Sequence, residues 1–176
     1  MRKLLILLAG CGSVLCAPAA NAGAATAKGC EGFLWPLATE LAWMKADTSE
    51  NVASGATLAA PPADKAVALA LLPASKVTFA AKPTSTQKPE DAEAFGGLVT
   101  FNATPAAHVQ VTLSAHGWID VVQNGVPLEA TGHTGSHDCD GIRKSVRFEI
   151  GPGPFSVQVS GMKKNIVKFA IRPAAD

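Results

Sequence analysis

The sequence predicts a mostly β protein: an antiparallel, jelly-roll-like β-sandwich of about seven or eight strands, with one N-terminal helix. Three observations support this fold class. Apolar and polar residues alternate with a period of two in several runs, turn residues separate these runs, and a single stretch repeats apolar residues at helical spacing. Because each strand then has one apolar side to bury, we expect two sheets packed face to face.

The N-terminal segment predicts export. Two basic residues precede a short apolar run, and the Ala-Asn-Ala of residues 20–22 suits signal peptidase, so residues 1–22 are interpreted as a signal peptide. The protein would then be periplasmic or secreted. Alternatively, residues 8–11, "LAGC", match a lipobox, in which Cys11 would carry a lipid anchor. No later segment has the roughly 20 apolar residues that a transmembrane helix needs.

The cysteines favour cleavage after residue 22. That cut leaves Cys30 and Cys139, as expected for one disulfide bond in an oxidising compartment. A cut before Cys11 would instead leave Cys16 as an odd thiol. We therefore predict a Cys30–Cys139 disulfide.

Composition limits the possible functions. The chain carries 15 basic and 14 acidic residues, so no global field would draw it to nucleic acid or to an anionic membrane. The sequence has no Gly-x-Ser-x-Gly elbow, phosphate loop, dinucleotide fingerprint or paired CxxC, and we expect no enzyme activity. We assign residues 23–62 to the helix and a connector, and residues 63–176 to the β-sandwich domain.

The predicted helix covers residues 35–46, with Pro36 in its first turn, where a missing N–H costs little. Trp43 is expected on the side opposite the apolar stripe. Residues 48–64 are small, polar and proline-containing, and they predict a connector. The apolar stripe of the helix consists of Leu34, Leu37, Leu41 and Met44.

Strands are expected from residue 67 onward. Residues 82–97 predict a polar loop, and residues 133–140 predict a glycine-containing loop. Asn124-Gly125 is a strong hairpin signal, followed by a short strand that Pro127 would keep at an edge. "GPGP", residues 151–154, predicts a second hairpin between its flanking strands. The predicted strands are 67–71, 77–79, 109–113, 118–123, 126–128, 146–150, 155–159 and 167–171.

The order "VQVTL…WIDVVQNGVPLE…KSVRFEIGPGPFSVQVSG…IVKFAI", from about Ala107 to Ile171, resembles the bacterial pre-peptidase C-terminal type of β-sandwich. The shared pattern is a strand, an Asp-bearing strand, an NG-type turn, a strand, a Gly-Pro-type turn and a strand. Asp120 supplies the aspartate, and Phe155 is the aromatic residue after the late glycine turn. The resemblance implies an accessory domain of a secreted protein, with a calcium or carbohydrate role.

The stretch "HTGSHDCD" raises the question of a metal site. All four histidines lie between His108 and His137, and zinc or copper takes imidazole and carboxylate ligands. Calcium would use the carboxylates and loop carbonyls. The alternative is a solvated loop. A spacing of four residues brings two side chains together on a helix, but residues 134–136 between the two histidines favour a loop. The candidate metal ligands are His133, His137, Asp138 and Asp140.

Two polar surfaces are candidates for ligand binding. One is the outward side of a strand that carries His108, Gln110 and Thr112. The other is a basic patch near the loop, which could bind an anion or an acidic polymer. Alternatively, these basic residues form an outer face that only keeps the protein soluble. The patch comprises Arg143, Lys144 and Arg147, with Lys163, Lys164 and Lys168 nearby.

These features predict an exported, non-catalytic β-sandwich that binds a ligand or accompanies a partner, such as a carbohydrate or another envelope protein. One alternative is a periplasmic protein that binds zinc, copper or calcium through residues 133–140. Another is a hydrolase with its site on the same loop. Asp120 and Glu129 are available as an acid/base pair but are not predicted to be catalytic.

Overall fold

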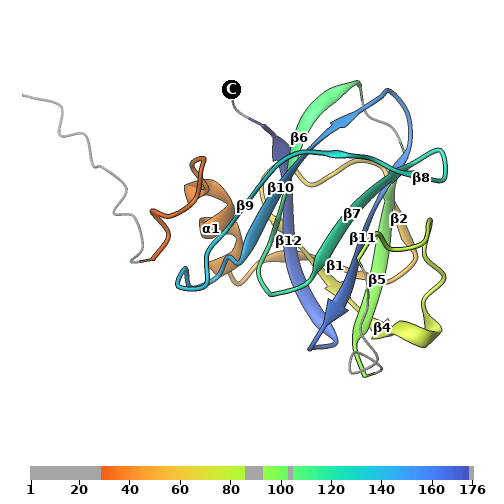
Figure 1. Cartoon of the computed structure of the whole chain (residues 1–176), viewed down its shortest axis with the longest axis horizontal. Helices are drawn as coiled ribbons and strands as arrows, with labels where there is room; N and C mark the ends of the chain where they lie inside the picture. The colour runs from red at the N-terminus through yellow and green to blue at the C-terminus, as the bar shows by residue number, and fades with distance from the viewer. Residues whose placement is uncertain (1–28, 86–92, 103–104, 175–176) are drawn as a thin grey trace, which may run out of the picture.

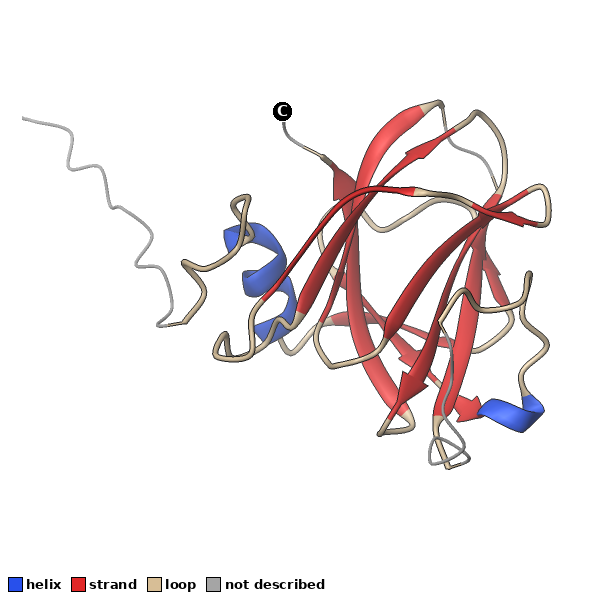
Figure 2. Ribbon diagram, viewed as in Figure 1, coloured by secondary structure: helices blue, strands red, loops and turns tan. Residues whose placement is uncertain are grey.

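Two six-stranded sheets pack face to face, and one α-helix lies against the outer side of one of them (Figure 1, Figure 2). This computed structural model describes residues 29–85, 93–102 and 105–174. The predicted signal peptide, residues 1–22, and the lipobox Cys11 lie outside the described residues. Within those ranges, no helix has the length and apolar character to cross a membrane.

Sheet A contains, in spatial order, β1 (Ser49–Ala53), β3 (Ala66–Ala70), β12 (Ile166–Pro173), β6 (Ala107–Leu113), β10 (Lys144–Ile150) and β9 (Ala130–Gly135). Sheet B contains β2 (Ala56–Leu58), β5 (Phe95–Phe101), β11 (Phe155–Met162), β7 (Trp118–Gln123) and β8 (Val126–Pro127), with β4 (Leu72–Pro73) also paired to β5. The helices are α1 (Ala38–Lys45) and the short 3-10 helix η1 (Ala74–Lys76).

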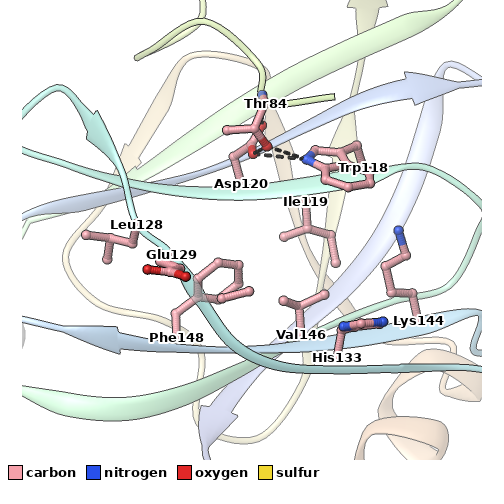
Figure 3. A pocket seen from close by; sticks show the side chains of 11 residues that line it. Thr84, Trp118, Ile119, Asp120, Leu128, Glu129, His133, Lys144, Val146 and Phe148 are labelled. Carbon is pink, nitrogen blue, oxygen red and sulfur yellow. Dashed lines mark hydrogen bonds between the residues drawn. The ribbon is translucent and has the colours of Figure 1, made fainter. Parts of the chain in front are cut away.

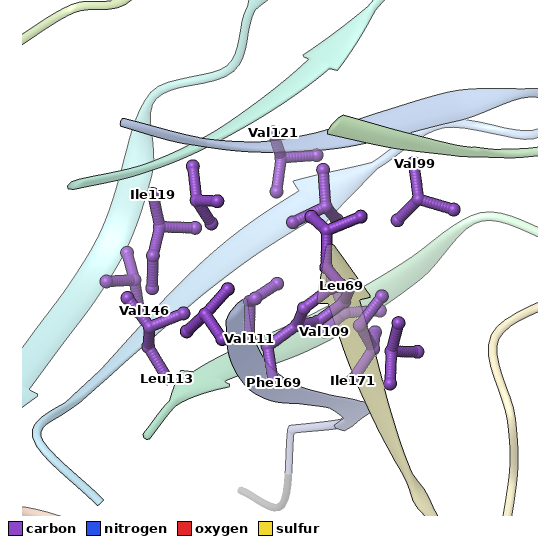
Figure 4. Close-up of a cluster of buried hydrophobic side chains, with 14 of the residues drawn as sticks. Leu69, Val99, Val109, Val111, Leu113, Ile119, Val121, Val146, Phe169 and Ile171 are labelled. Atoms are coloured by element: carbon purple, nitrogen blue, oxygen red, sulfur yellow. The ribbon is translucent and has the colours of Figure 1, made fainter. Parts of the chain in front are cut away.

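The mostly β sandwich with an N-terminal helix is confirmed. The sheets are mixed, however, because β1 runs parallel to β3 and β2 runs parallel to β5. The predicted alternation places one apolar row from each sheet in the space between them (Figure 4). The labelled members of this core are Leu69, Val99, Val109, Val111, Leu113, Ile119, Val121, Val146, Phe169 and Ile171, all 7% exposed or less.

The two predicted hairpins have opposite outcomes. Asn124 and Gly125 form the expected turn with positive φ of 53° and 75°, and Pro127 lies in the edge strand β8. The "GPGP" hairpin is wrong, since β10 pairs with β6 and β9 whereas β11 pairs with β5 and β7. The segment instead carries the chain from sheet A to sheet B. Periodicity finds the apolar side of each strand, but it does not assign the strand to a sheet.

Four predicted segments need correction. The expected connector, residues 48–64, contains β1 and β2, whose mostly small or polar residues give no clear strand pattern. The loop predicted for residues 82–97 ends earlier, because β5 begins at Phe95. Gly96 and Gly97 lie inside β5, where a Cβ would collide with the Phe79 ring or with Leu71. Residues 77–79 form no strand, and His133 lies on β9 rather than in a loop.

The helix begins later than predicted, at Ala38. Leu34 is 79% exposed and is not part of the apolar stripe, whereas Leu37 and Met44 are buried. Trp43 is half-buried, and it packs against the small apolar cluster below the helix. The side of sheet A under the helix also includes polar side chains, since Gln110 of β6 donates a hydrogen bond to the buried Glu40 of α1.

Candidate functional site

The predicted disulfide is confirmed: Cys30 and Cys139 are bonded, with their Cα atoms 4.5 Å apart. The bond attaches the segment before α1 to the turn after β9. Ser136 Oγ adds a hydrogen bond to Gly29 O at 2.8 Å, and Arg143 Nη1 donates to the carbonyls of His137 and Cys139. Arg143 thereby holds the disulfide turn in place.

The polar side of β6 is covered rather than open. Gln110 and Thr112 are only 3% and 0% exposed, because the α1 segment lies over them. Thr112 Oγ1 lies 2.9 Å from Ser145 Oγ, which accepts a 3.2 Å hydrogen bond from Trp35 Nε1. The expectation of an outward, solvent-facing strand side is thus wrong for these two residues. Sequence periodicity shows which side is polar, but not what covers it.

His108 remains half-exposed at the end of the same strand. Its Nε2 lies 2.9 Å from Thr131 Oγ1 on β9. It forms no metal-binding group with His133 and His137 among the described residues. A hydrogen bond between the side chains of His108 on β6 and Thr131 on β9 therefore accounts for the position of the His108 ring.

The basic residues do not form one patch. Strand alternation along β10 directs Lys144 and Arg147 to opposite sides of sheet A. Arg147 lies under the helix segment, with its guanidinium carbon 4.2 Å from the centre of the Trp35 ring. Lys168 donates to the carbonyls of Met44 and Ala46 at 3.1 and 2.8 Å, which satisfies the C-terminal end of α1. Lys163 and Lys164 are exposed.

The histidines and aspartates of residues 133–140 also separate. His133 lines a pocket described below, whereas the His137 ring lies 5.0 Å from the His116 ring. The Asp140 side chain is 94% exposed and lies 4.0 Å from Lys45 Nζ. Asp138 is also exposed. Among the described residues, no three His, Cys, Asp or Glu side chains gather closely enough to hold a metal ion.

Positive charge does collect at one end of the sandwich, near His116. Partial desolvation, followed by the charges of His137, Arg143, Lys144 and Lys163, lowers the pKa of His116. His116 is therefore held in its neutral form to a lower pH than an ordinary histidine.

A pocket of about 460 Å³ opens where the two sheets part at one edge (Figure 3). We call it the edge pocket. β11 pairs with β7 on one side, whereas on the other side β8 pairs only with Val122 and Gln123. Within the described chain, the first half of β7 therefore has no strand on that second side, and the pocket opens there. Its lining consists of Thr84, Trp118, Ile119, Asp120, Leu128, Glu129, Ala130, His133, Lys144, Val146 and Phe148.

The floor of the edge pocket is apolar. Ile119, Val146 and Phe148 belong to the sandwich core, and their side chains also point into this space (Figure 3). Leu128 closes one end. Pockets of this size with an apolar lining and few polar groups are typical small-molecule sites.

Lys144 is the main cationic group of the edge pocket. Its Nζ donates to Gly117 O at 3.0 Å and lies 4.8 Å from the centre of the Trp118 ring. Burial lowers the pKa of Lys144, since desolvation disfavours the ammonium form. An anionic group beside this amine would restore a favourable environment for the charge.

Asp120 is already fully engaged. It is 4% exposed, and its carboxylate accepts hydrogen bonds from Thr84 N, Thr84 Oγ1, Trp118 Nε1 and Gln158 Nε2, at 3.3, 2.5, 3.1 and 3.3 Å. Gln158 also bonds both backbone groups of Ala81. These bonds fasten residues 81–85 over the outer side of sheet B. Asp120 thus holds residues 81–85 in position. Glu129 is exposed, and no hydrogen bond joins it to Asp120 within the described chain.

Sequence reasoning selected Lys144 and His133 as candidate site residues and named Asp120 and Glu129 as an available acid/base pair, but it missed the other residues of the pocket. Trp118, Ile119, Val146 and Phe148 lie on strands whose alternation marks them as core or edge residues, whereas Thr84 and Leu128 lie outside the strands. Pro127 is the one available signal, because it ends the pairing of β8 and leaves the edge open.

Comparison of the chain with protein families, with curated proteins and with solved structures finds no match. The resemblance to the pre-peptidase C-terminal type of domain therefore stays a prediction.

Proposed function

We propose that this is an exported, non-catalytic binding protein whose edge pocket takes a small amphipathic molecule with an apolar body and a carboxylate group. The observation that carries the proposal is the apolar floor of Ile119, Val146 and Phe148 with the half-buried ammonium of Lys144 beside it. The predicted signal peptide and the disulfide support export. The apolar floor favours an acyl or aromatic ligand over a carbohydrate.

A pocket-filling substitution should abolish binding. Ala130 lies on the edge strand β9, lines the pocket and is exposed, so Ala130→Trp should fill the site without disturbing the core. We expect decanoate to bind the unaltered protein in isothermal titration calorimetry and not to bind this variant. Ala53→Trp, on the opposite edge strand β1 of sheet A, is the matched control and should bind normally. Equal binding by both variants would refute the site.

The charge of Lys144 should give a pH dependence. Because burial lowers its pKa below the ordinary 10.5, the free protein loses this cation earlier than a solvated lysine would. Decanoate affinity should therefore fall as the pH rises from about 7 to about 10. In Lys144→Gln the affinity should be lower at neutral pH and nearly constant over that range. Decanol, which carries no charge, should bind both proteins with little pH dependence; the same pH profile for decanol would count against a carboxylate ligand.

A further inference from the structure

The edge of β7 forms one wall of the edge pocket, and the proposed function does not use its backbone. Trp118, Ile119 and Asp120 are consecutive residues of β7, and all three line the pocket. Side chains of a strand alternate between two sides, so consecutive residues share a lining where a pocket runs along the strand edge. Figure 3 shows these residues across the pocket from Val146 and Phe148. A ligand in the pocket therefore lies beside the backbone of β7.

Two hydrogen bonds show which backbone groups of β7 point to this open side. Leu128 N donates to Val121 O at 2.8 Å, so the peptide groups of Val121 point away from β11. In an antiparallel sheet the N–H and C=O of one residue point to the same side of the strand, and this side alternates along the chain. The N–H and C=O of Ile119 therefore point to the open side as well. The carbonyl of Gly117, two residues earlier, accepts a hydrogen bond from Lys144 Nζ at 3.0 Å.

The peptide groups of Ile119 have no partner within the described chain. Ile119 lies opposite Val159 of β11, but its N–H and C=O point the other way. On the open side, the pairing of β8 ends at Val122, and Leu128 bonds Val121. Ile119 is 5% exposed, and unpaired backbone groups at such burial cost free energy. A ligand that carries its own N–H and C=O would satisfy them.

We propose that the edge pocket binds the C-terminal residue of a peptide chain, which pairs with Ile119 as an added antiparallel strand. This inference rests on the proposed function, because it uses the same pocket and the same ammonium. The N–H of the last peptide residue donates to Ile119 O, and its carboxylate accepts from Ile119 N–H and Lys144 Nζ. The antiparallel direction follows from the position of Lys144, since only an antiparallel chain ends beside Gly117. Added strands of this kind gain affinity from the backbone and specificity from side-chain pockets.

The same pairing selects the side chain of the last residue. Residues paired across strands place their side chains on the same side of the sheet, so this side chain lies beside that of Ile119, over Val146 and Phe148. The preferred chain therefore ends in a large apolar residue such as leucine. Because Leu128 already lies opposite Val121, the added strand is short, and the preceding residues of the peptide leave the sheet.

The test is isothermal titration calorimetry of the protein with N-acetylated glycyl-alanyl-leucine. We expect this peptide to bind, and its C-terminal amide should bind about tenfold more weakly or worse, because a hydrogen bond to a charged group is lost. In Lys144→Gln, whose fold is verified by thermal unfolding, the difference between acid and amide should shrink. Methylation of the leucine nitrogen removes the donor to Ile119 O and should also weaken binding to the unaltered protein by about tenfold.

The matched control ligand is isocaproate, which keeps the leucine side chain and the carboxylate but has no peptide N–H. It should bind at least about tenfold more weakly than the peptide. Equal affinity for the peptide and its N-methylated form would overturn the strand pairing. If decanoate binds and the peptide does not, this inference fails and the proposed function stands. If neither ligand binds, both fail.

Discussion

Replacing Cys30 and Cys139 together by alanine should lower the free energy of unfolding by about 4 to 5 kcal/mol. The disulfide closes a loop with a sequence separation of 109 residues, and in the chain-entropy description a loop of this length restricts the unfolded chain strongly. The bond also attaches α1 to the sandwich. Guanidinium chloride unfolding of the variant and the unaltered protein measures the difference.

The control for this prediction uses a reductant. Dithiothreitol should shift the unfolding midpoint of the unaltered protein toward that of the double variant and should leave the double variant unchanged. Amide hydrogen exchange should show the largest loss of protection in α1 and in residues 136–143, which the bond connects. A double variant as stable as the unaltered protein would contradict the prediction.

The sequence is sufficient to predict the C-terminal strands, because their core residues alternate without interruption. β6, β7, β10, β11 and β12 all match predicted runs. The turn at Asn124-Gly125 is equally predictable, since few residues accept the positive φ that this turn requires. The disulfide follows from the small number of cysteines and the expected compartment.

The missed strands lack such a signal. β1 and β2 are short edge strands of mostly small or polar residues with partly exposed sides, so little apolar area marks them. β5 is a central strand, but it carries Gly96 and Gly97 because Phe79 and Leu71 pack closely against its backbone. The residues in these strands are explained by tertiary contacts, which local sequence patterns do not show.

The candidate sites depend on tertiary structure in the same way. The predicted basic patch combines Lys144 with Arg147, whereas strand alternation directs the two side chains to opposite sides of sheet A. The edge pocket arises where the first half of β7 has a paired strand on only one side. Gln110 illustrates the point. Its polar character is evident from sequence, yet its burial follows only from the position of α1.

Glu40→Ala should destabilise the protein by about 3 kcal/mol, near the lower end of the range for breaking a buried ion pair. Glu40 is fully buried, and its loss leaves Arg172 and the Gln110 amide without a carboxylate acceptor. The lower end applies because the Arg172 side chain is 35% exposed, so water still solvates part of its charge. Thr39→Ala, at the exposed neighbouring position of α1, should change the stability by no more than about 0.5 kcal/mol.

A further measurement decides whether charge or packing causes this loss of stability. Glu40→Leu combined with Arg172→Leu should be less destabilising than Glu40→Ala, because the double variant leaves no unpaired charge at this position. If the double variant is the less stable one, Glu40 stabilises the helix by packing rather than by its charge.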